Sequence, residues 1–155
     1  HHSALIQPQQ NLLAELTPAL AAFQEGLENC GLADSVLTFS ASDFARTLRS
    51  NGSGSDHAWG GNQFVMGGPV AGGQVLGQYP NIALNSPDDV GRGGRILPTT
   101  SVDSLVAELL LWFGLEGRSN FEKVLPNLEN FYNIEDADSA DPTTLPIGFL
   151  KPDAF

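Results

Sequence analysis

The chain has 155 residues, a formal net charge of -11 and an apolar fraction of 41%. This length fits one domain that can bury a sizeable core. The acidic surface repels phosphate backbones, so we expect no nucleic-acid partner. No apolar run approaches the ~20 residues of a membrane span, and no basic start precedes an apolar leader, so we expect no membrane partner.

Apolar residues recur at helical spacing over residues 9–29 and predict an amphipathic helix with one buried stripe. Pro18 either kinks this helix or begins a second segment capped by Thr17. Gly31 is placed to end the helix, and the single Cys30 is expected to be a small buried hydrophobic residue. The stripe consists of Leu12, Leu13, Leu16, Leu20, Phe23 and Leu27.

The middle of the chain reads as short strands joined by glycine-rich turns. A run at 32–39 predicts a buried strand, because it is too short and too β-branched for a buried helix. A helix followed by such a strand is half of an α/β unit. Residues 51–94 hold twelve of the seventeen glycines, which predict turns with positive φ between short extended pieces. This region contains neither glycine-rich phosphate-binding fingerprint.

The last third of the sequence predicts two helices and a tail. Ser101 is a good N-cap, and the apolar face after it predicts a helix over 102–113. A shorter helix is expected at 120–125, before a proline. The acidic, aperiodic residues 134–155 are expected to form an extended tail on the surface. The sequence therefore predicts an α/β domain over residues 1–133.

Titratable side chains gather beyond the first predicted strand, at the sheet edge where ligands bind in α/β proteins. Asp43 and His57 could supply two ligands of a metal ion, with Asp56 beside His57. Alternatively, His57 bonds Asp56 or a backbone carbonyl, and Asp43 caps a short helix. Arg46 and Arg49, on one face of that helix, could grip an oxyanion or pair with local carboxylates. A Ser-His-Asp triad has little support, because the sequence contains no G-x-S-x-G nucleophile elbow.

Long motifs are spread over nearly the whole chain. They are 42–48 (SDFARTL), 50–62 (SNGSGSDHAWGGN), 65–68 (VMGG), 77–80 (GQYP), 91–95 (GRGGR), 98–103 (PTTSVD) and 112–114 (WFG). With these motifs the chain resembles the bacterial family labelled domain of unknown function 1501. That family is similar to the alkaline phosphatase and sulfatase superfamily, which implies an α/β/α sandwich with a mixed sheet and flanking helices. The resemblance also implies export to the periplasm.

The resemblance implies a metal centre at the carboxyl edge of the sheet. His2, Asp43 and His57 would be the ligands of zinc, manganese or calcium. Asp56 would orient a ligand from the second shell, and Arg46 would contact an anionic phosphate or sulfate ester. His2 falls where the family has the end of a Gly-aromatic-Asp-x-His motif, so it is either a native ligand or the remnant of a tag.

Two hypotheses follow from the resemblance. Family members are longer, and the chain matches their C-terminal portion, so the nucleophile segment of the superfamily is expected elsewhere. Phe44 stands where the superfamily's Ser-Asp-His-Gly motif has a histidine ligand. The chain is then part of a metal-dependent ester hydrolase that is inactive alone. The alternative is a non-catalytic α/β binding or scaffold module with a degenerate metal site. In either case, an exposed sheet edge predicts self-association.

Overall fold

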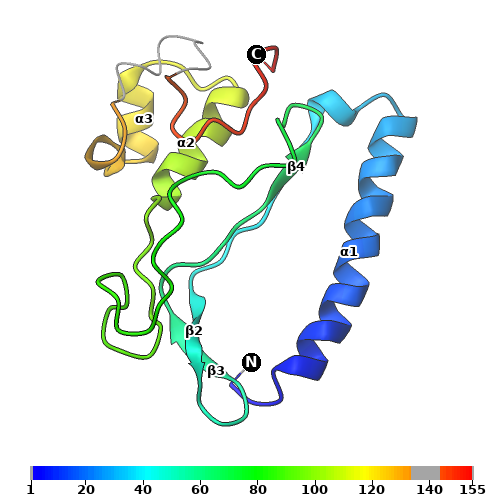
Figure 1. The fold of residues 1–155 in the computed structure, drawn as a ribbon. Helices are drawn as coiled ribbons and strands as arrows, with labels where there is room; N and C mark the ends of the chain where they lie inside the picture. The colour runs from blue at the N-terminus through cyan, green and yellow to red at the C-terminus, as the bar shows by residue number, and fades with distance from the viewer. Residues whose placement is uncertain (1, 134–143, 155) are drawn as a thin grey trace. The chain divides into compact units, whose positions relative to one another are not determined.

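The computed structural model describes residues 2–133 and 144–154, and the chain divides into two compact units (Figure 1). Unit 1 comprises residues 1–67 and 79–99, and unit 2 comprises residues 68–78 and 100–155. Within the described ranges, no helix is both long and apolar enough to cross a lipid bilayer.

Unit 1 begins with α1, which spans Ile6–Asn29 and continues through Pro18. The predicted helix is therefore confirmed and starts slightly earlier than expected. Gly31 follows with a φ of +69°, the left-handed conformation that commonly ends helices. The predicted burial is wrong. No residue of α1 is buried and Cys30 is exposed, because no other described element covers the helix closely enough.

The first sheet of unit 1 is an antiparallel pair. β1 (Leu37–Phe39) pairs with β4 (Val65–Gly67), so the strand predicted at 32–39 is confirmed over its last three residues. Its predicted burial is wrong, because none of the three residues is buried and Phe39 is exposed. Gly67 has a φ of +144°, and a Cβ at this position would lie 2.4 Å from the carbonyl oxygen of Val36. Only glycine permits such a close approach of the two strands.

The second sheet of unit 1 is a hairpin. β2 (Ala45–Ser50) and β3 (Ser55–Ala58) run antiparallel, with Arg46 opposite His57. Asn51 stabilises the connecting loop, since its side-chain oxygen accepts two backbone N–H bonds at 3.2 and 2.9 Å. The hairpin therefore has a fixed turn rather than a flexible loop.

This hairpin corrects three expectations. The chain after Asp43 enters a strand, so no helix exists there for Asp43 to cap. Arg46 and Arg49 do not share a helical face, because residues three apart in an extended chain lie on different sides. His57 lies in β3 rather than in a loop. The Asn51-Gly52 pair, a strong signal for a tight hairpin turn, explains the difference.

The buried carboxylate of Asp89 closes a loop of unit 1. Its Oδ2 accepts the backbone N–H groups of Asn85 and Gly93 at 2.9 and 3.1 Å. Its Oδ1 accepts those of Gly94 and Arg95 at 2.8 and 3.0 Å. These bonds, first the one from Asn85, lower the pKa of Asp89. Backbone N–H groups of β2 donate to the same loop, which is thereby fixed against the hairpin.

Unit 2 is built on two helices, both of which confirm predictions. α2 (Val102–Trp112) begins after Ser101, whose hydroxyl oxygen accepts the N–H of Ser104 at 3.0 Å. α3 (Arg118–Val124) follows, and then the short 3-10 helix η2 (Leu128–Asn130). Their apolar sides meet in a core made of Ala107, Phe121, Leu125 and Leu128.

Glu108 of α2 is fully buried and binds the chain near its C-terminus. Its two oxygens accept the backbone N–H groups of residues 147–150 at distances of 2.6–3.0 Å. Phe149 and Leu150 are buried. We expected residues 134–155 to form an extended tail on the surface. Residues 147–150 instead pack against α2. Residues 134–143 of that predicted tail lie outside the described residues.

The predicted α/β class is confirmed, because residues 2–133 and 144–154 contain three α-helices and two small sheets. Both sheets are antiparallel pairs of strands in the described part of the chain. The larger α/β/α sandwich with a mixed sheet is not seen among these residues and stays a prediction.

Candidate functional site

The hairpin of unit 1 positions two of the expected site residues next to each other. Asp56 and His57 are consecutive residues of β3. The backbone N–H of Asp56 donates to the hydroxyl of Thr47 in β2 at 3.1 Å. Pairing with β2 thus fixes the strand from which both side chains project.

His2 lies against both of these residues, although it is more than fifty positions away in the sequence. Its Nδ1 is 3.2 Å from Oδ1 of Asp56, and its Nε2 is 3.1 Å from Nε2 of His57. Asn51 completes the cluster, because its side-chain amide donates to the backbone oxygen of His2 and to Oδ1 of Asp56, both at 2.9 Å. Asn51 therefore links the N-terminal segment to the hairpin.

The carboxylate of Asp56 sets the proton positions in this cluster. An ionised carboxylate only accepts hydrogen bonds, so Nδ1 of His2 carries the proton in this pair. In the neutral ring, Nε2 of His2 then presents a lone pair to His57. Hydrogen bonds from Asn51 and then from His2 lower the pKa of Asp56, which keeps it ionised.

Loss of surrounding water lowers the pKa of His57 first, and the positive charge of Arg46 lowers it further, so the neutral form of the ring is favoured. The ring stacks on Phe44 with 3.9 Å between centroids. Arg46 donates to the backbone oxygen of Ser55 at 3.0 Å and lies 5.2 Å from the Phe44 ring centre. The guanidinium predicted to contact an anion is thus engaged by the hairpin itself.

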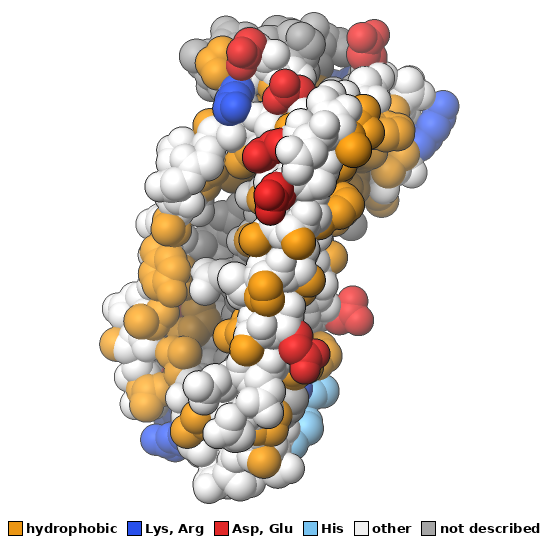
Figure 2. Space-filling view, turned by 90° about the vertical axis from the view of Figure 1, so that its right-hand side faces the viewer, with side chains coloured by type: hydrophobic (Ala, Val, Ile, Leu, Met, Phe, Trp, Pro, Cys, Tyr) orange, Lys and Arg blue, Asp and Glu red, His pale blue; other side chains and the backbone are white. Residues whose placement is uncertain are grey.

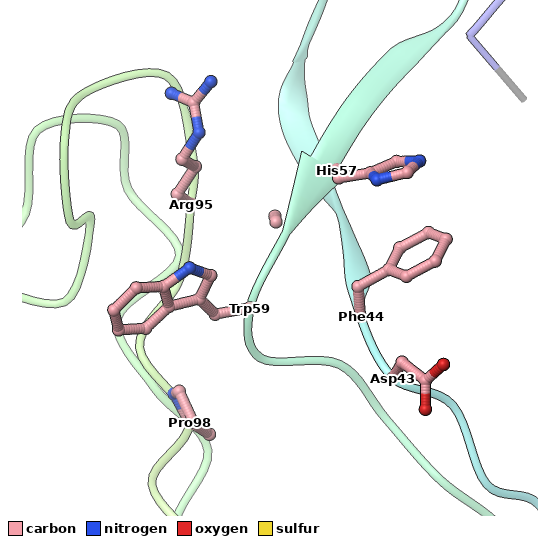
Figure 3. A pocket seen from close by; sticks show the side chains of 7 residues that line it. Asp43, Phe44, His57, Trp59, Arg95 and Pro98 are labelled. Atoms are coloured by element: carbon pink, nitrogen blue, oxygen red, sulfur yellow. The ribbon is translucent and has the colours of Figure 1, made fainter.

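His57 also lines an open pocket of about 440 Å³. Figure 3 shows Trp59 and Arg95 on one side of this pocket, and Asp43, Phe44 and His57 on the other. The structure thus places Asp43 and His57 on one pocket and brings His2 to His57. The lining residues are Asp43, Phe44, His57, Ala58, Trp59, Arg95 and Pro98.

Sequence reasoning missed three residues of this site: Asn51, Trp59 and Arg95. Asn51 carries a signal that could have identified it, since an Asn-Gly pair typically lies in a hairpin turn. Arg95 reaches the pocket because the bonds to Asp89 fix its backbone, a contact that no local pattern indicates. Trp59 directly follows β3 and remains 64% exposed.

The two histidines fit half of a metal centre. Two ligands about 2.1 Å from one ion, at angles of roughly 95–109°, lie about 3.1–3.4 Å apart. The 3.1 Å between Nε2 of His2 and Nε2 of His57 meets this condition. A carboxylate on the second nitrogen of a ligand histidine, as Asp56 provides, is the usual outer contact. Among the described residues, however, no three His, Cys, Asp or Glu side chains form a ready metal cluster.

Comparison with known proteins gives one match. The family model described as "Protein of unknown function (DUF1501)" matches residues 1–125. No curated protein and no solved structure matches the chain.

Proposed function

Because the chain belongs to the DUF1501 family, whose function is unknown, we propose a function from the site itself: it binds a divalent metal ion for the hydrolysis of an anionic ester. The observation that carries this proposal is the contact between Nε2 of His2 and Nε2 of His57. Asp56 accepts a hydrogen bond from the other nitrogen of His2, and Asn51 donates to the same carboxylate. A histidine pair whose second nitrogen contacts a carboxylate is typical of metal sites.

The metal would be held by His2 and His57, with Asp43 from the same pocket as the third ligand. Imidazole nitrogen suits zinc and other transition metals, whereas calcium prefers oxygen ligands, so zinc is the expected ion. When bound, such an ion supplies Lewis-acid polarisation of the ester oxygen.

Other residues of the site would orient the ligands and the substrate. Asp56 keeps the proton on Nδ1 of His2 and so directs its Nε2 towards His57. Phe44 restricts rotation of the His57 ring by stacking on it. Arg95 lines the pocket and Arg46 does not, and although Nη1 of Arg95 donates to the backbone oxygen of Arg92 at 3.3 Å, its other N–H groups suit the charged end of a phosphate or sulfate ester.

A second function is supported by the composition of the pocket. None of its seven lining residues is a serine, threonine or cysteine, so the pocket wall offers no nucleophile of these types. Phe44 is a ring that cannot bind a metal. Both observations favour a protein that holds a metal without turning over an ester. In that case the chain is a binding module with a degenerate centre.

Calorimetric titration of the whole chain with Zn²⁺ tests metal binding, which both proposed functions require. We expect stoichiometric binding and a metal-dependent rise in melting temperature. His57→Ala should abolish both, while Trp59→Ala, which removes an exposed ring of the same pocket but no ligand, should leave both unchanged. Asp56→Asn should weaken binding about 10–100-fold. Absence of zinc binding by the unaltered chain would overturn both functions.

Assays with aryl phosphate and aryl sulfate then separate the two functions. Zinc-dependent turnover that disappears in His57→Ala supports the hydrolase. Zinc binding at the same site without turnover supports the binding module. Phe44→His sharpens the distinction, because it restores the histidine of the related motif and should tighten zinc binding if Phe44 stands at a ligand position.

A further inference from the structure

The turn between β2 and β3 contains the single Asn-Gly pair of the sequence, Asn51-Gly52. Both residues are exposed. Gly52 has a φ of +107°, and a Cβ at this position would meet nothing within 4 Å, so the turn is open to water on this side. An asparagine side chain can react with the backbone nitrogen of the next residue, and glycine has no side chain to shield that nitrogen. Asn51 therefore has the neighbour that intramolecular deamidation requires.

Backbone N–H groups of the turn activate the side-chain carbonyl of Asn51. Its Oδ1 accepts the N–H groups of Ser53 and Gly54 at 3.2 and 2.9 Å. Two such donors on one carbonyl oxygen stabilise the negative charge that this oxygen gains when a nucleophile adds to Cγ. The attacking nitrogen belongs to Gly52, and its N–H donates to the hydroxyl oxygen of Ser50 at 3.0 Å, which draws the proton away from the nitrogen.

We propose that Asn51 is a deamidation site, and that the reaction removes the amide that links the N-terminal segment to the hairpin. The nitrogen of Gly52 loses its proton to water and bonds to Cγ of Asn51. The bond from Cγ to Nδ2 breaks, and Nδ2 leaves with a proton as ammonia. Water then opens the cyclic imide at one of its two carbonyl carbons, which gives aspartate or isoaspartate. The reaction consumes one water molecule, releases one ammonia molecule and involves no oxidation or reduction.

The product cannot make the hydrogen bonds that Asn51 makes. Nδ2 of Asn51 donates to the backbone oxygen of His2 and to Oδ1 of Asp56, both at 2.9 Å. A carboxylate at neutral pH only accepts hydrogen bonds, so it would face two acceptors in place of two partners. It would also repel the carboxylate of Asp56. Figure 2 shows histidine side chains at the surface, where water can replace the lost contacts.

Deamidation would therefore loosen the hold of the hairpin on His2. The contacts that remain are those of the His2 ring with Asp56 and His57, and the 3.3 Å bond from the backbone N–H of Leu5 to the oxygen of Ser53. The chemical change and the release of the segment stand without a metal ion. The accompanying loss of His2 as a ligand rests on the proposed function.

Peptide mapping by mass spectrometry tests the reaction. The whole chain is incubated at neutral pH, folded in one sample and unfolded in urea in the other. We expect Asn51 of the folded chain to become a mixture of aspartate and isoaspartate, which elute separately. Asn62 is also exposed but precedes glutamine, so it should remain an amide and serves as the internal control. An Asn51 that stays an amide in the folded chain after it has converted fully in urea would overturn the proposal.

Asn51→Asp reproduces one product directly and tests the release of the segment. Hydrogen exchange at the backbone N–H of Leu5 should become about tenfold faster, because a bond that holds the segment is lost. Asn62→Asp adds the same charge outside the hairpin and should leave this exchange unchanged. Circular dichroism verifies that both variants remain folded. Unchanged exchange in Asn51→Asp would overturn the release, whereas faster exchange in a chain that binds no zinc would support the release and overturn only the metal site.

Discussion

Among the described residues, each unit contains a buried carboxylate that accepts four backbone N–H bonds. The two carboxylates differ in how far along the chain their donors lie. In unit 1, the donors to Asp89 lie within six residues of it. In unit 2, the donors to Glu108 lie 39 to 42 residues away. The same chemistry therefore braces a local loop in one unit and anchors a distant segment in the other. Losing the first should loosen a loop, and losing the second should release a packed segment.

Each unit also contains one of the two tryptophans, Trp59 in unit 1 and Trp112 in unit 2. Changing either one to phenylalanine leaves a single fluorescent reporter in the other unit. Unfolding in urea can therefore be followed separately in each unit. The loss of stability caused by removing each carboxylate can then be measured in its own unit.

Glu108→Gln should give the largest effect. The amide group replaces one acceptor oxygen by a donor, which faces backbone N–H groups around a fully buried side chain. We expect a loss of about 3–5 kcal/mol in the free energy of unfolding, seen through Trp112. Proteases should also cut near residues 144–154 more rapidly. A change in stability below about 1 kcal/mol would show that this carboxylate does not anchor the segment.

Asp89→Asn should give a smaller loss, seen through Trp59, because it frees only a local loop. The lowered pKa of Asp89 adds a dependence on pH. As the pH falls below about 5, the unfolded chain takes up the proton first, so stability from Asp89 is present above the unfolded pKa and is lost towards the folded one. The variant should lack this loss at acid pH. An unchanged pH slope in urea titrations would contradict the role given to Asp89.

Gly94 and Gly148 offer a matched pair, since each donates to one of the two carboxylates and each has positive φ, +79° and +84°. A Cβ on Gly94 would lie 2.4 Å from Cβ of Leu48, whereas a Cβ on Gly148 meets nothing within 4 Å. Gly148→Ala should cost about 1 kcal/mol from the backbone alone, and Gly94→Ala about 2–3 kcal/mol. Equal losses in urea would mean that the loop at Gly94 moves away from the hairpin.

Glu122→Gln provides the baseline, as an acid-to-amide change on an exposed face of unit 2. Glu122 accepts a 2.7 Å bond from Arg118, and both side chains are nearly half exposed. Exposed pairs contribute little, so we expect a change below about 0.5 kcal/mol in the same urea experiment. A loss similar to that of Glu108→Gln would show that burial is not what distinguishes the two glutamates.

The parts of the fold that depend on near neighbours were predictable. The cap at Ser101 and the apolar face after it identified α2, because the residues that start a helix and those that form its buried side are close together in the sequence. The hairpin was missed because Asp43 was weighed as a helix cap, while the turn signal at Asn51-Gly52 was not used. In the site, Asp56 and His57 were found from their own sequence, but His2 entered only through the family resemblance.

Contacts between distant residues were not predictable. Glu108 is one of two acids on an otherwise largely apolar helix without Lys or Arg, a position that sequence patterns also allow at the surface. Nothing local indicates that residues 147–150 donate to it. Likewise, the covering of α1 could not be decided from its periodicity, because an apolar stripe has the same spacing whether its partner lies in the same chain or in another copy.

The different spans of the two carboxylates also have a consequence for the order of folding events. The entropy lost on closing a loop grows by about 0.6 kcal/mol for each doubling of its length, so the contact of Glu108 costs about 2 kcal/mol more to close than that of Asp89. Closure of a short loop takes about 10–100 ns. The Asp89 loop can therefore form before the rest of unit 1 has folded. The segment bound by Glu108 can join only after α2 and α3 offer it a surface, which makes it the last part of unit 2 to fold and the first to leave.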